Sequence, residues 1–537
     1  MAWVLRNRLG LQVGDRVAIF SGNHTWFPIT VYACELSGLV ATLVNPGSTA
    51  KELASFVSMT DSKVLLAHPA VLGKAAEAAR SIPDLQLLSL DETDEMRESS
   101  APGVIDVRSL LGDEEQETFT VDNAAERTVF ICFSSGTSGF PKAVEITHAN
   151  VIASLAQMLV THEGSFTSSD VQIGVLPFCH IYGLVKIIHH PFMIGMPVVI
   201  LPRFDMVTFC RQVEAHRATI SLLVPPIILL MSNSPIVDQH DLSSLKVIQS
   251  GGAPLSPDLA RQVESKWPNL RIVQGYGLTE SCPSVICTGP VWLPSSRESV
   301  GRIAPGVEVR LIDDEGNDVP RSKDGDKSCA PGELWLRGPS IMKGYLHNPT
   351  ANADAFPEAG TRWFNTGDVA YYSAGELFVI DRKKELIKYK GFQVPPAELE
   401  AMLLTHPKLC DALVLGVVDE SQATELPRAY VVPRNSAVLQ DETQKMRLAA
   451  EVASWVAANV ANHKKLRGGV FLVASIPKSP SGKLLRRVMR QQVALADAQA
   501  AATTAGVLSS ALNSVPVISA IPQQVYPQEA QPIIPAV

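Results

Sequence analysis

The stretch that decides the fold is TVFICFSSGTSGFPKAVEITHAN at residues 128–150. Its first part, VFICF at 129–133, is a short run of β-branched and aromatic residues, which is typical of a buried strand. SSGTSGFPK follows directly at 134–142. Glycines there allow the backbone to turn its N–H groups toward an anion, hydroxyls add donors, and the lysine supplies a positive charge. The sequence therefore predicts a polyphosphate-binding loop at the end of a strand.

The spacing in this loop differs from that of the kinase and GTPase loop G-x-x-x-x-G-K-[ST]. Gly136 and Gly139 are separated by two residues, and Pro141 precedes Lys142. A kinase or GTPase of that type is therefore disfavoured. The alternative is a Ser/Gly-rich surface loop without a ligand, and the adjoining strand, proline and lysine argue against it. The residues expected to surround the phosphates are Ser134, Ser135, Gly136, Thr137, Ser138, Gly139 and Lys142.

Outward from the loop, short apolar runs alternate with helical segments as far as about residue 380. This alternation predicts an α/β architecture, and a length of 537 residues predicts at least two domains. The expected strands are 17–20, 129–133, 220–224 and 246–249, and two of the expected helices are 149–160 and 257–266.

A second unit begins near Asp381, where DRKKELIKYKG is dense in charge. The pattern beyond it predicts a compact α+β domain. We therefore expect a large domain at 1–381, a small domain at 382–495, and a disordered tail rich in Ala, Pro and Gln at 496–537. In the small domain we expect helices at 397–404 and 446–462 and strands at 411–418, 429–433 and 469–474.

Charge and composition exclude several classes of protein. With 54 acidic and 46 basic residues the net charge is −8, which argues against a nucleic-acid binder with a broad basic face. The eight cysteines are scattered, so we expect reduced thiols. We expect no signal peptide, no transmembrane segment, since Lys186 and Pro191 interrupt the most apolar stretch at 184–201, and no peroxisomal tripeptide. The expected location is cytoplasmic.

Five further motifs follow the loop in order along the chain. They are QGYGLTES at 274–281, GELWLRG at 332–338, TGD at 366–368, DRKKE at 381–385 with KGFQ at 390–393, and PSGK at 480–483. Together with the loop they make the chain resemble the adenylate-forming superfamily, which contains acyl-CoA synthetases, 4-coumarate–CoA ligases, luciferases and peptide-synthetase adenylation domains. The resemblance implies a large N-terminal domain of layered β-sheets and helices and a small, mobile α+β C-terminal domain.

The resemblance also implies roles for individual residues. Asp368 would accept hydrogen bonds from the ribose hydroxyls, and Glu280 would bind Mg²⁺, with Thr137 near the metal. Lys483 would catalyse adenylation after a domain rotation about Lys384, and Lys388 would contact the acyl adenylate. The other implied ATP- or AMP-binding residues are Gly252, Ala253, Gln274, Gly275, Tyr276, Gly277, Thr279, Arg382 and Gln393, and the implied CoA-binding residues are Arg203, Lys390 and Gly391.

PFCHIYG at 177–183 resembles the segment that lines the acyl pocket of coumarate ligases, where His180 would take part in the active site. Lys186 stands where these ligases have a small polar residue. If Lys186 points inward, its ammonium would be costly to bury without a partner, which favours an acid with a polar or acidic far end. The alternative is a lysine that extends outward to solvent. The other residues expected in the pocket are Cys179, Tyr182, Pro283 and Ser284.

The predicted function is that of an acyl-CoA ligase for an aryl or medium-chain acid, used in secondary metabolism or acid catabolism. ATP, Mg²⁺ and coenzyme A are the expected cofactors and co-substrates, and a monomer or homodimer is expected. Relatives usually have several dozen more residues before the segment at 9–16, so a shortened N-terminus is expected. Three alternatives stay open: loading of a carrier-protein thiol, a luciferase-like oxygenase, and a non-catalytic nucleotide-binding protein.

Overall fold

The computed structural model describes residues 1–91, 104–134, 141–162, 166–287, 296–320, 329–390, 392–419, 422, 424–478 and 484–493. The chain divides into two compact units. The first unit contains Met1–Leu386 and Pro395–Ala401. The second contains Ile387–Val394 and, among the described residues, 402–478 and 484–493.

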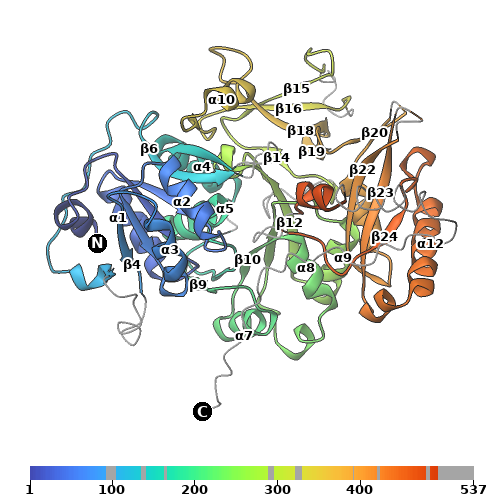
Figure 1. Cartoon of the computed structure of the whole chain (residues 1–537), viewed down its shortest axis with the longest axis horizontal. Helices are drawn as coiled ribbons and strands as arrows, with labels where there is room; N and C mark the ends of the chain where they lie inside the picture. The colour runs from blue at the N-terminus through green and yellow to red at the C-terminus, as the bar shows by residue number, and fades with distance from the viewer. Residues whose placement is uncertain are drawn as a thin grey trace, which may run out of the picture. The chain divides into compact units, whose positions relative to one another are not determined.

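The first unit contains a sheet of eight strands, in the order β17-β7-β6-β2-β1-β3-β4-β5. From β6 to β5 neighbouring strands run parallel, which fits their continuous apolar runs, because strands covered on both faces have no polar side. Helices α2 (Ala50–Met59) and α3 (Leu72–Ala79) lie side by side in Figure 1 and pack on one face through Leu53 and Ala75. The strands are β1 (Arg16–Phe20), β2 (Val40–Val44), β3 (Val64–Ala67), β4 (Gln86–Ser89), β5 (Ile105–Asp106), β6 (Thr128–Ser134), β7 (Lys142–Thr147) and β17 (Gly344–Tyr345).

A second sheet has the order β14-β13-β12-β11-β10-β8-β9. Its strands from β12 to β9 are parallel, and β13 and β14 are antiparallel additions at one edge. One apolar core joins it to the eight-stranded sheet, with Phe130 of β6 and Ile173 of β8 as fully buried members. The strands are β8 (Gln172–Gly174), β9 (Val198–Ile200), β10 (Ile220–Leu223), β11 (Val247–Ser250), β12 (Arg271–Tyr276), β13 (Ile286–Cys287) and β14 (Arg302–Ile303).

Helices connect these strands, as expected for parallel neighbours. Thr147 caps α4 through a hydrogen bond from the Asn150 N–H to its side chain, and Asp205 caps α7 in the same way. The helices of the first unit are α1 (Trp26–Leu36), α2 (Ala50–Met59), α3 (Leu72–Ala79), α4 (His148–Thr161), α5 (Ile181–Gly183), α6 (His190–Ile194), α7 (Met206–His216), α8 (Pro225–Asn233), α9 (Pro257–Lys266) and α10 (Pro349–Ala355).

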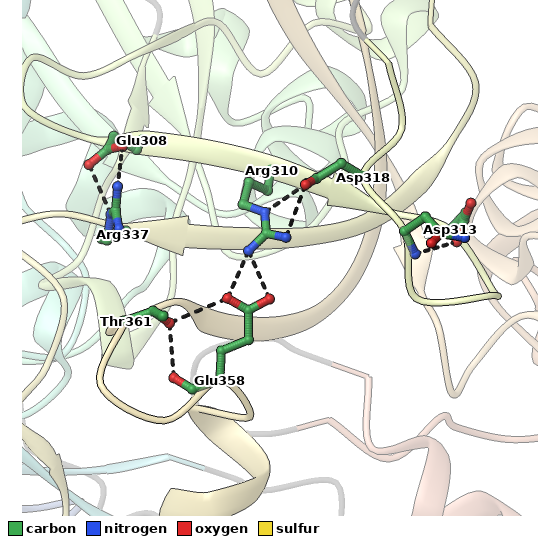
Figure 2. Close-up of polar contacts among 8 residues, drawn as sticks. Glu308, Arg310, Asp313, Asp318, Arg337, Glu358 and Thr361 are labelled. Atoms are coloured by element: carbon green, nitrogen blue, oxygen red, sulfur yellow. Dashed lines mark hydrogen bonds and ion pairs between the residues drawn. The ribbon is translucent and has the colours of Figure 1, made fainter.

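A third sheet in the first unit is antiparallel, in the order β15 (Glu308–Ile312), β16 (Gly332–Arg337), β18 (Phe364–Ser373) and β19 (Glu376–Arg382). Figure 2 shows the charged network on this sheet. Arg310 donates to Asp318 at 2.7 Å and to Glu358 at 2.9 Å. Its guanidinium also lies over the rings of Trp335 and Trp363. Bidentate pairs of this kind fix geometry, so the network stiffens the sheet that carries Asp368.

The second unit contains the hairpin of β20 (Ile387–Tyr389) and β21 (Phe392–Val394), and a sheet of β22 (Leu409–Asp419), β23 (Thr424–Pro433) and β24 (Val470–Leu472). Helix α12 (Glu442–Asn459) packs beside β24. A further helix, α11 (Pro396–Leu404), begins among the residues assigned to the first unit and ends in the second.

All of the predicted elements are present, and two of them begin at least four residues earlier than expected. The helix expected at 446–462 is α12, which begins at Glu442 because Asp441 accepts hydrogen bonds from the N–H groups of Thr443 and Gln444. The strand expected at 429–433 is β23, which extends back to Thr424 because it pairs with β22 along its whole length. The predicted α/β fold class is confirmed, and so is the large N-terminal domain of layered sheets and helices. Within the described ranges, no helix is both long and apolar enough to cross a bilayer.

Candidate active site

The carboxyl ends of β11 and β12 lie at the same edge of the second sheet, because these strands are parallel neighbours. Gly251 and Gly252 follow β11, and Gly277 follows Tyr276 at the end of β12. Ligands of parallel α/β sheets bind at this edge. The motif residues from two distant parts of the sequence therefore meet at one place.

Gly277 is required by a close approach to backbone, and Gly251 lies in a tight contact with a side chain. A Cβ on Gly277 would lie 1.6 Å from the carbonyl oxygen of Pro283, and a Cβ on Gly251 would lie 3.1 Å from the ring of Tyr182. Gly252 has φ +81°, a conformation that side-chain-bearing residues rarely adopt. The sheet edge thus keeps backbone exposed where a larger residue would not fit.

A buried carboxylate lies beside this edge. Tyr276 donates from its hydroxyl to Oδ2 of Asp368 at 2.5 Å. Arg382, paired with Asp368 in the β18–β19 register, places Nε 3.8 Å from Oδ1. Burial raises the pKa of Tyr276 and the charge of Asp368 raises it further, so the phenol stays protonated and acts as a donor. A carboxylate held in this way is suited to accept two vicinal hydroxyls.

Glu280 lies in a short turn directly after β12, and its side chain is 7% exposed. Its Oε1 accepts a hydrogen bond from the Tyr345 hydroxyl at 2.9 Å. Burial and the charge of Glu280 both raise the pKa of Tyr345, so this hydroxyl is also a neutral donor. Lys142 is far from Tyr345 in the sequence, yet its Nζ lies 4.6 Å from the centroid of the Tyr345 ring. Tyr345 therefore connects Glu280 to the lysine of the predicted phosphate loop.

The donor set at Glu280 fits one class of cation. Mg²⁺ is commonly bound by one or two carboxylates together with substrate phosphates, rather than by an all-protein cage. Among the described residues, no group of three or more His, Cys, Asp or Glu side chains could hold a metal ion. A lone buried carboxylate near a phosphate-binding loop is thus compatible with a cation that also binds phosphate.

A pocket of about 410 Å³, counting its open mouth, adjoins the sheet edge. His180 lines it and caps α5, since its Nδ1 accepts a hydrogen bond from the Tyr182 N–H at 3.3 Å. Tyr182 donates from its hydroxyl to the carbonyl of Gln249 at 3.4 Å. The lining residues are His180, Ile181, Tyr182, Lys186, Gln249, Gly251, Gly252, Gly275, Gly277, Leu278, Thr279, Pro283 and Ser284.

Lys186 belongs to the wall of this pocket and is 3% exposed. Its Nζ donates to Oε1 of Gln249 at 3.0 Å. The alternative of a lysine extending to solvent is therefore wrong. The reason is local: Lys186 lies in the π-helical turn η5 (Leu184–His189), and all residues of this turn are buried.

Two family models match the chain. Residues 1–346 match the model described as AMP-binding enzyme, and residues 398–483 match the AMP-binding enzyme C-terminal domain. The chain belongs to the AMP-binding enzyme family. The predicted membership of the adenylate-forming enzymes is confirmed.

Relatives of this AMP-binding enzyme include 4-coumarate–CoA ligase 1 of Solanum tuberosum, which is 35% identical over 495 residues, covering 91% of this chain and 86% of that protein. ATP-bound MatB from Rhodopseudomonas palustris is 25% identical, with a TM-score of 0.76 and 91% of each chain covered. The o-succinylbenzoate CoA synthetase of Bacillus subtilis, solved with its acyl-adenylate intermediate, is 26% identical, with a TM-score of 0.71 and 90% of each chain covered.

The predicted phosphate loop of this AMP-binding enzyme is described only at its borders. Ser134 ends β6 and pairs with Lys142 of β7. Its Oγ is buried and, within the described residues, has no hydrogen-bond partner, as expected of a donor whose partner is a ligand. The remaining loop residues, Ser135, Gly136, Thr137, Ser138 and Gly139, lie outside the described residues, as do Gly391 and Lys483. Their predicted roles stay predictions.

Some predicted residues lie elsewhere or have structural partners. The Gln274 side chain accepts from the Leu255 N–H at 3.2 Å and donates to the Arg297 carbonyl at 2.7 Å, so its amide supports two loops. Cys179 is fully enclosed, and burial raises its pKa to about 12, so it is a neutral thiol. Arg203 is exposed after β9, and Ala253 is exposed after β11.

Residues of the second unit are described by themselves. The Lys388 N–H donates to Oε2 of Glu425 at 2.8 Å, and the Lys390 N–H donates to Oγ1 of Thr424 at 2.7 Å. Both lysine side chains are exposed, as are those of Gln393 and, in the first unit, Lys384. Their predicted contacts with CoA and the adenylate, and the hinge at Lys384, stay predictions.

Two residues of the site were not predicted from the sequence. Gln249 is the polar residue that ends the strand run at 246–249, directly before Ser250 and the two glycines, and this position could have identified it. Tyr345 follows the motif at 332–338 without a signal of its own. Its contact with Glu280 depends on tertiary structure alone.

Proposed function

We propose that this AMP-binding enzyme is an AMP-forming acid–CoA ligase. In the first half-reaction a carboxylate oxygen of the organic acid attacks the α-phosphorus of ATP, and pyrophosphate leaves. In the second, the thiolate of coenzyme A attacks the acyl carbon, and AMP leaves with the bonding electrons. The ligase class agrees with the names of the relatives, and the site supplies binding and electrostatic stabilisation, which such chemistry requires.

The observation that carries the proposal is the fixed pair of Tyr276 and Asp368 beside the open sheet edge. The 2.5 Å hydrogen bond and the burial of Asp368 hold its carboxylate ready for two ribose hydroxyls. Gly252, with φ +81°, is exposed and has no side chain that would keep the adenine base from its backbone. We assign the remaining nucleotide contacts to Ser134, Lys142 and Thr279, whose hydroxyl or ammonium groups suit phosphate oxygens.

Glu280 would hold Mg²⁺ in this proposal. A bound Mg²⁺ would neutralise part of the phosphate charge. The chain itself keeps the Glu280 carboxylate in place through the Tyr345 hydroxyl and through the Met342 N–H, which donates to the Glu280 carbonyl at 2.9 Å. Of the predicted catalytic residues, Lys483 would stabilise the charge that develops on the α-phosphate, and His180 would border the reacting carboxylate.

The acyl group would occupy the pocket beside His180 and Tyr182. The experiment that tests the proposal supplies ATP and a panel of aryl, medium-chain and dicarboxylic acids, with and without coenzyme A. We expect ATP to be converted to AMP and pyrophosphate, and an acyl-CoA thioester to appear only with coenzyme A. Formation of ADP, or no nucleotide binding, would overturn the proposal. An adenylate without transfer to coenzyme A would instead favour a carrier-protein thiol.

A further inference from the structure

The pocket has an exposed end and a buried end. Gly252 at the sheet edge is exposed, whereas Lys186 is 3% and Gln249 is 1% exposed. If the carboxylate to be activated faces the nucleotide at the open edge, the far end of the acid faces Lys186 and Gln249. This inference rests on the proposed function, because it uses that orientation of the acid.

Two donors converge at the buried end. Lys186 Nζ donates to Oε1 of Gln249 at 3.0 Å, and within the described residues Nε2 of the same amide has no hydrogen-bond partner. A Cβ on Gly275, a residue of the pocket lining, would lie 3.4 Å from this Nε2. A buried amide N–H left without an acceptor is destabilising. A ligand oxygen placed there would remove that cost.

Two histidines near Lys186, His162 and His190, add no charge to this end of the pocket. Burial and, to a smaller extent, the charge of Lys186 together lower the pKa of His190 to about 4. Burial and the same charge lower the pKa of His162. Both imidazoles are therefore neutral near pH 7, and the ammonium of Lys186 is the charge that a ligand meets.

We propose that Lys186 and Gln249 form a subsite for a second carboxylate, so that the preferred substrate is an acid with a carboxylate at its far end. The two side chains offer an ammonium and an amide N–H to the two oxygens of one carboxylate. An acid with an apolar far end would leave the ammonium facing a methyl group or a ring edge. A site that hydrogen-bonds a substrate group discriminates strongly against the analogue without it.

The test compares acids of matched length. One set is 4-carboxycinnamic, 4-hydroxycinnamic and 4-methylcinnamic acid, and the other is adipic and heptanoic acid. The measured quantity is kcat/KM for AMP formation, and the second readout is the Kd of the corresponding acyl sulfamoyl-adenosines by calorimetry. We expect the carboxylate-bearing member to be preferred over its methyl-bearing partner by about tenfold or more in at least one set.

The variants are Lys186→Met and Gln249→Leu, with Lys51→Met on the exposed face of α2 as the matched control. We expect Lys186→Met to reduce the preference by about tenfold or more, Gln249→Leu to reduce it less, and Lys51→Met to leave it unchanged. A ratio unchanged in Lys186→Met, a preference for the methyl-bearing acids in both sets, or a preference for 4-hydroxycinnamic over 4-carboxycinnamic acid would overturn the subsite.

The two proposals fail differently. Absence of AMP formation with every acid would contradict the ligase, and the calorimetric ratios would still decide the subsite. AMP formation without a preference for the second carboxylate would contradict the subsite and leave the ligase intact. If Lys186→Met does not fold, Gln249→Leu decides the question. An unchanged preference for the carboxylate-bearing acid in this variant, in both kcat/KM and Kd, would overturn the subsite.

Discussion

Tyr276 and Asp368, which are far apart in the sequence, share a hydrogen bond of 2.5 Å, and this bond joins the end of β12 to β18 of the antiparallel sheet. The sheet edge that would receive a nucleotide is thereby connected to the carboxylate that would bind its ribose. Because the phenol is a neutral donor, its hydrogen bond stabilises the ionised carboxylate of Asp368 without adding a charge to the site.

Tyr276→Phe removes only this hydroxyl. We expect the KM for ATP to rise by about tenfold, because a hydrogen bond to a charged group contributes about 1.5–3 kcal/mol, while kcat changes little. Steady-state kinetics with ATP as the varied substrate measure both KM and kcat. Tyr371→Phe is the control, because Tyr371 lies in β18, the strand of Asp368, and its ring stacks on Phe378. If both variants raise KM equally, the contact with Asp368 has no role in nucleotide binding.

Glu280→Gln keeps the shape of the side chain and an oxygen that can accept from the Tyr345 hydroxyl. If Glu280 holds Mg²⁺, the loss of its charge should reduce AMP formation by about a hundredfold and move the Mg²⁺ titration to higher concentration. Tyr345→Phe should have a smaller effect, since it removes one hydrogen bond at 2.9 Å and leaves the carboxylate. A Mg²⁺ titration that is unchanged in Glu280→Gln would remove the metal role.

Gly277→Ala should destabilise the first unit and abolish activity, because the new Cβ would lie 1.6 Å from the Pro283 carbonyl oxygen and the backbone would have to move. We expect a loss of more than about 2 kcal/mol, seen as a lower apparent melting temperature. Gly73→Ala is the matched control, since Gly73 lies in α3 with nothing within 4 Å of its Cβ position. This substitution should stabilise by about 0.5–1 kcal/mol.

Stability should fall as the pH is lowered from about 6.5 to about 4. Burial lowers the pKa of both His24 and His190 to about 4, whereas an unfolded histidine has a pKa near 6.5. In this window the unfolded state therefore binds more protons than the folded state, and protonation favours unfolding. The dependence should be weaker in His190→Phe and unchanged in His216→Gln, at the exposed end of α7. Urea titrations at several pH values measure it, and equal slopes in all three proteins would contradict it.

The sequence predicts the motifs better than their mutual contacts. The strand at 129–133 and the helix at 257–266 were predicted because their residue patterns are local signals. The partner of Glu280, by contrast, is Tyr345, which arrives from an edge strand of the other sheet. The inward direction of Lys186 was also undecided from sequence, because a π-helical turn whose residues are all buried has no periodic signature.

Lys483→Ala tests the division of labour that the motif at 480–483 predicts. A lysine that stabilises charge on the α-phosphate acts in adenylation and has no part in the attack of a thiolate on the finished adenylate. We therefore expect the variant to lose pyrophosphate release from acid and ATP by about a thousandfold, and to retain most of the transfer from a preformed acyl adenylate to coenzyme A. Lys445→Ala on α12, whose ammonium pairs with Glu442 at 2.6 Å, is the control and should keep both half-reactions. Since transfer is measured on the supplied adenylate, a folding defect would reduce both steps together. Equal loss in the two half-reactions of a folded Lys483→Ala protein would therefore assign the lysine to a step that adenylation and thioester formation share.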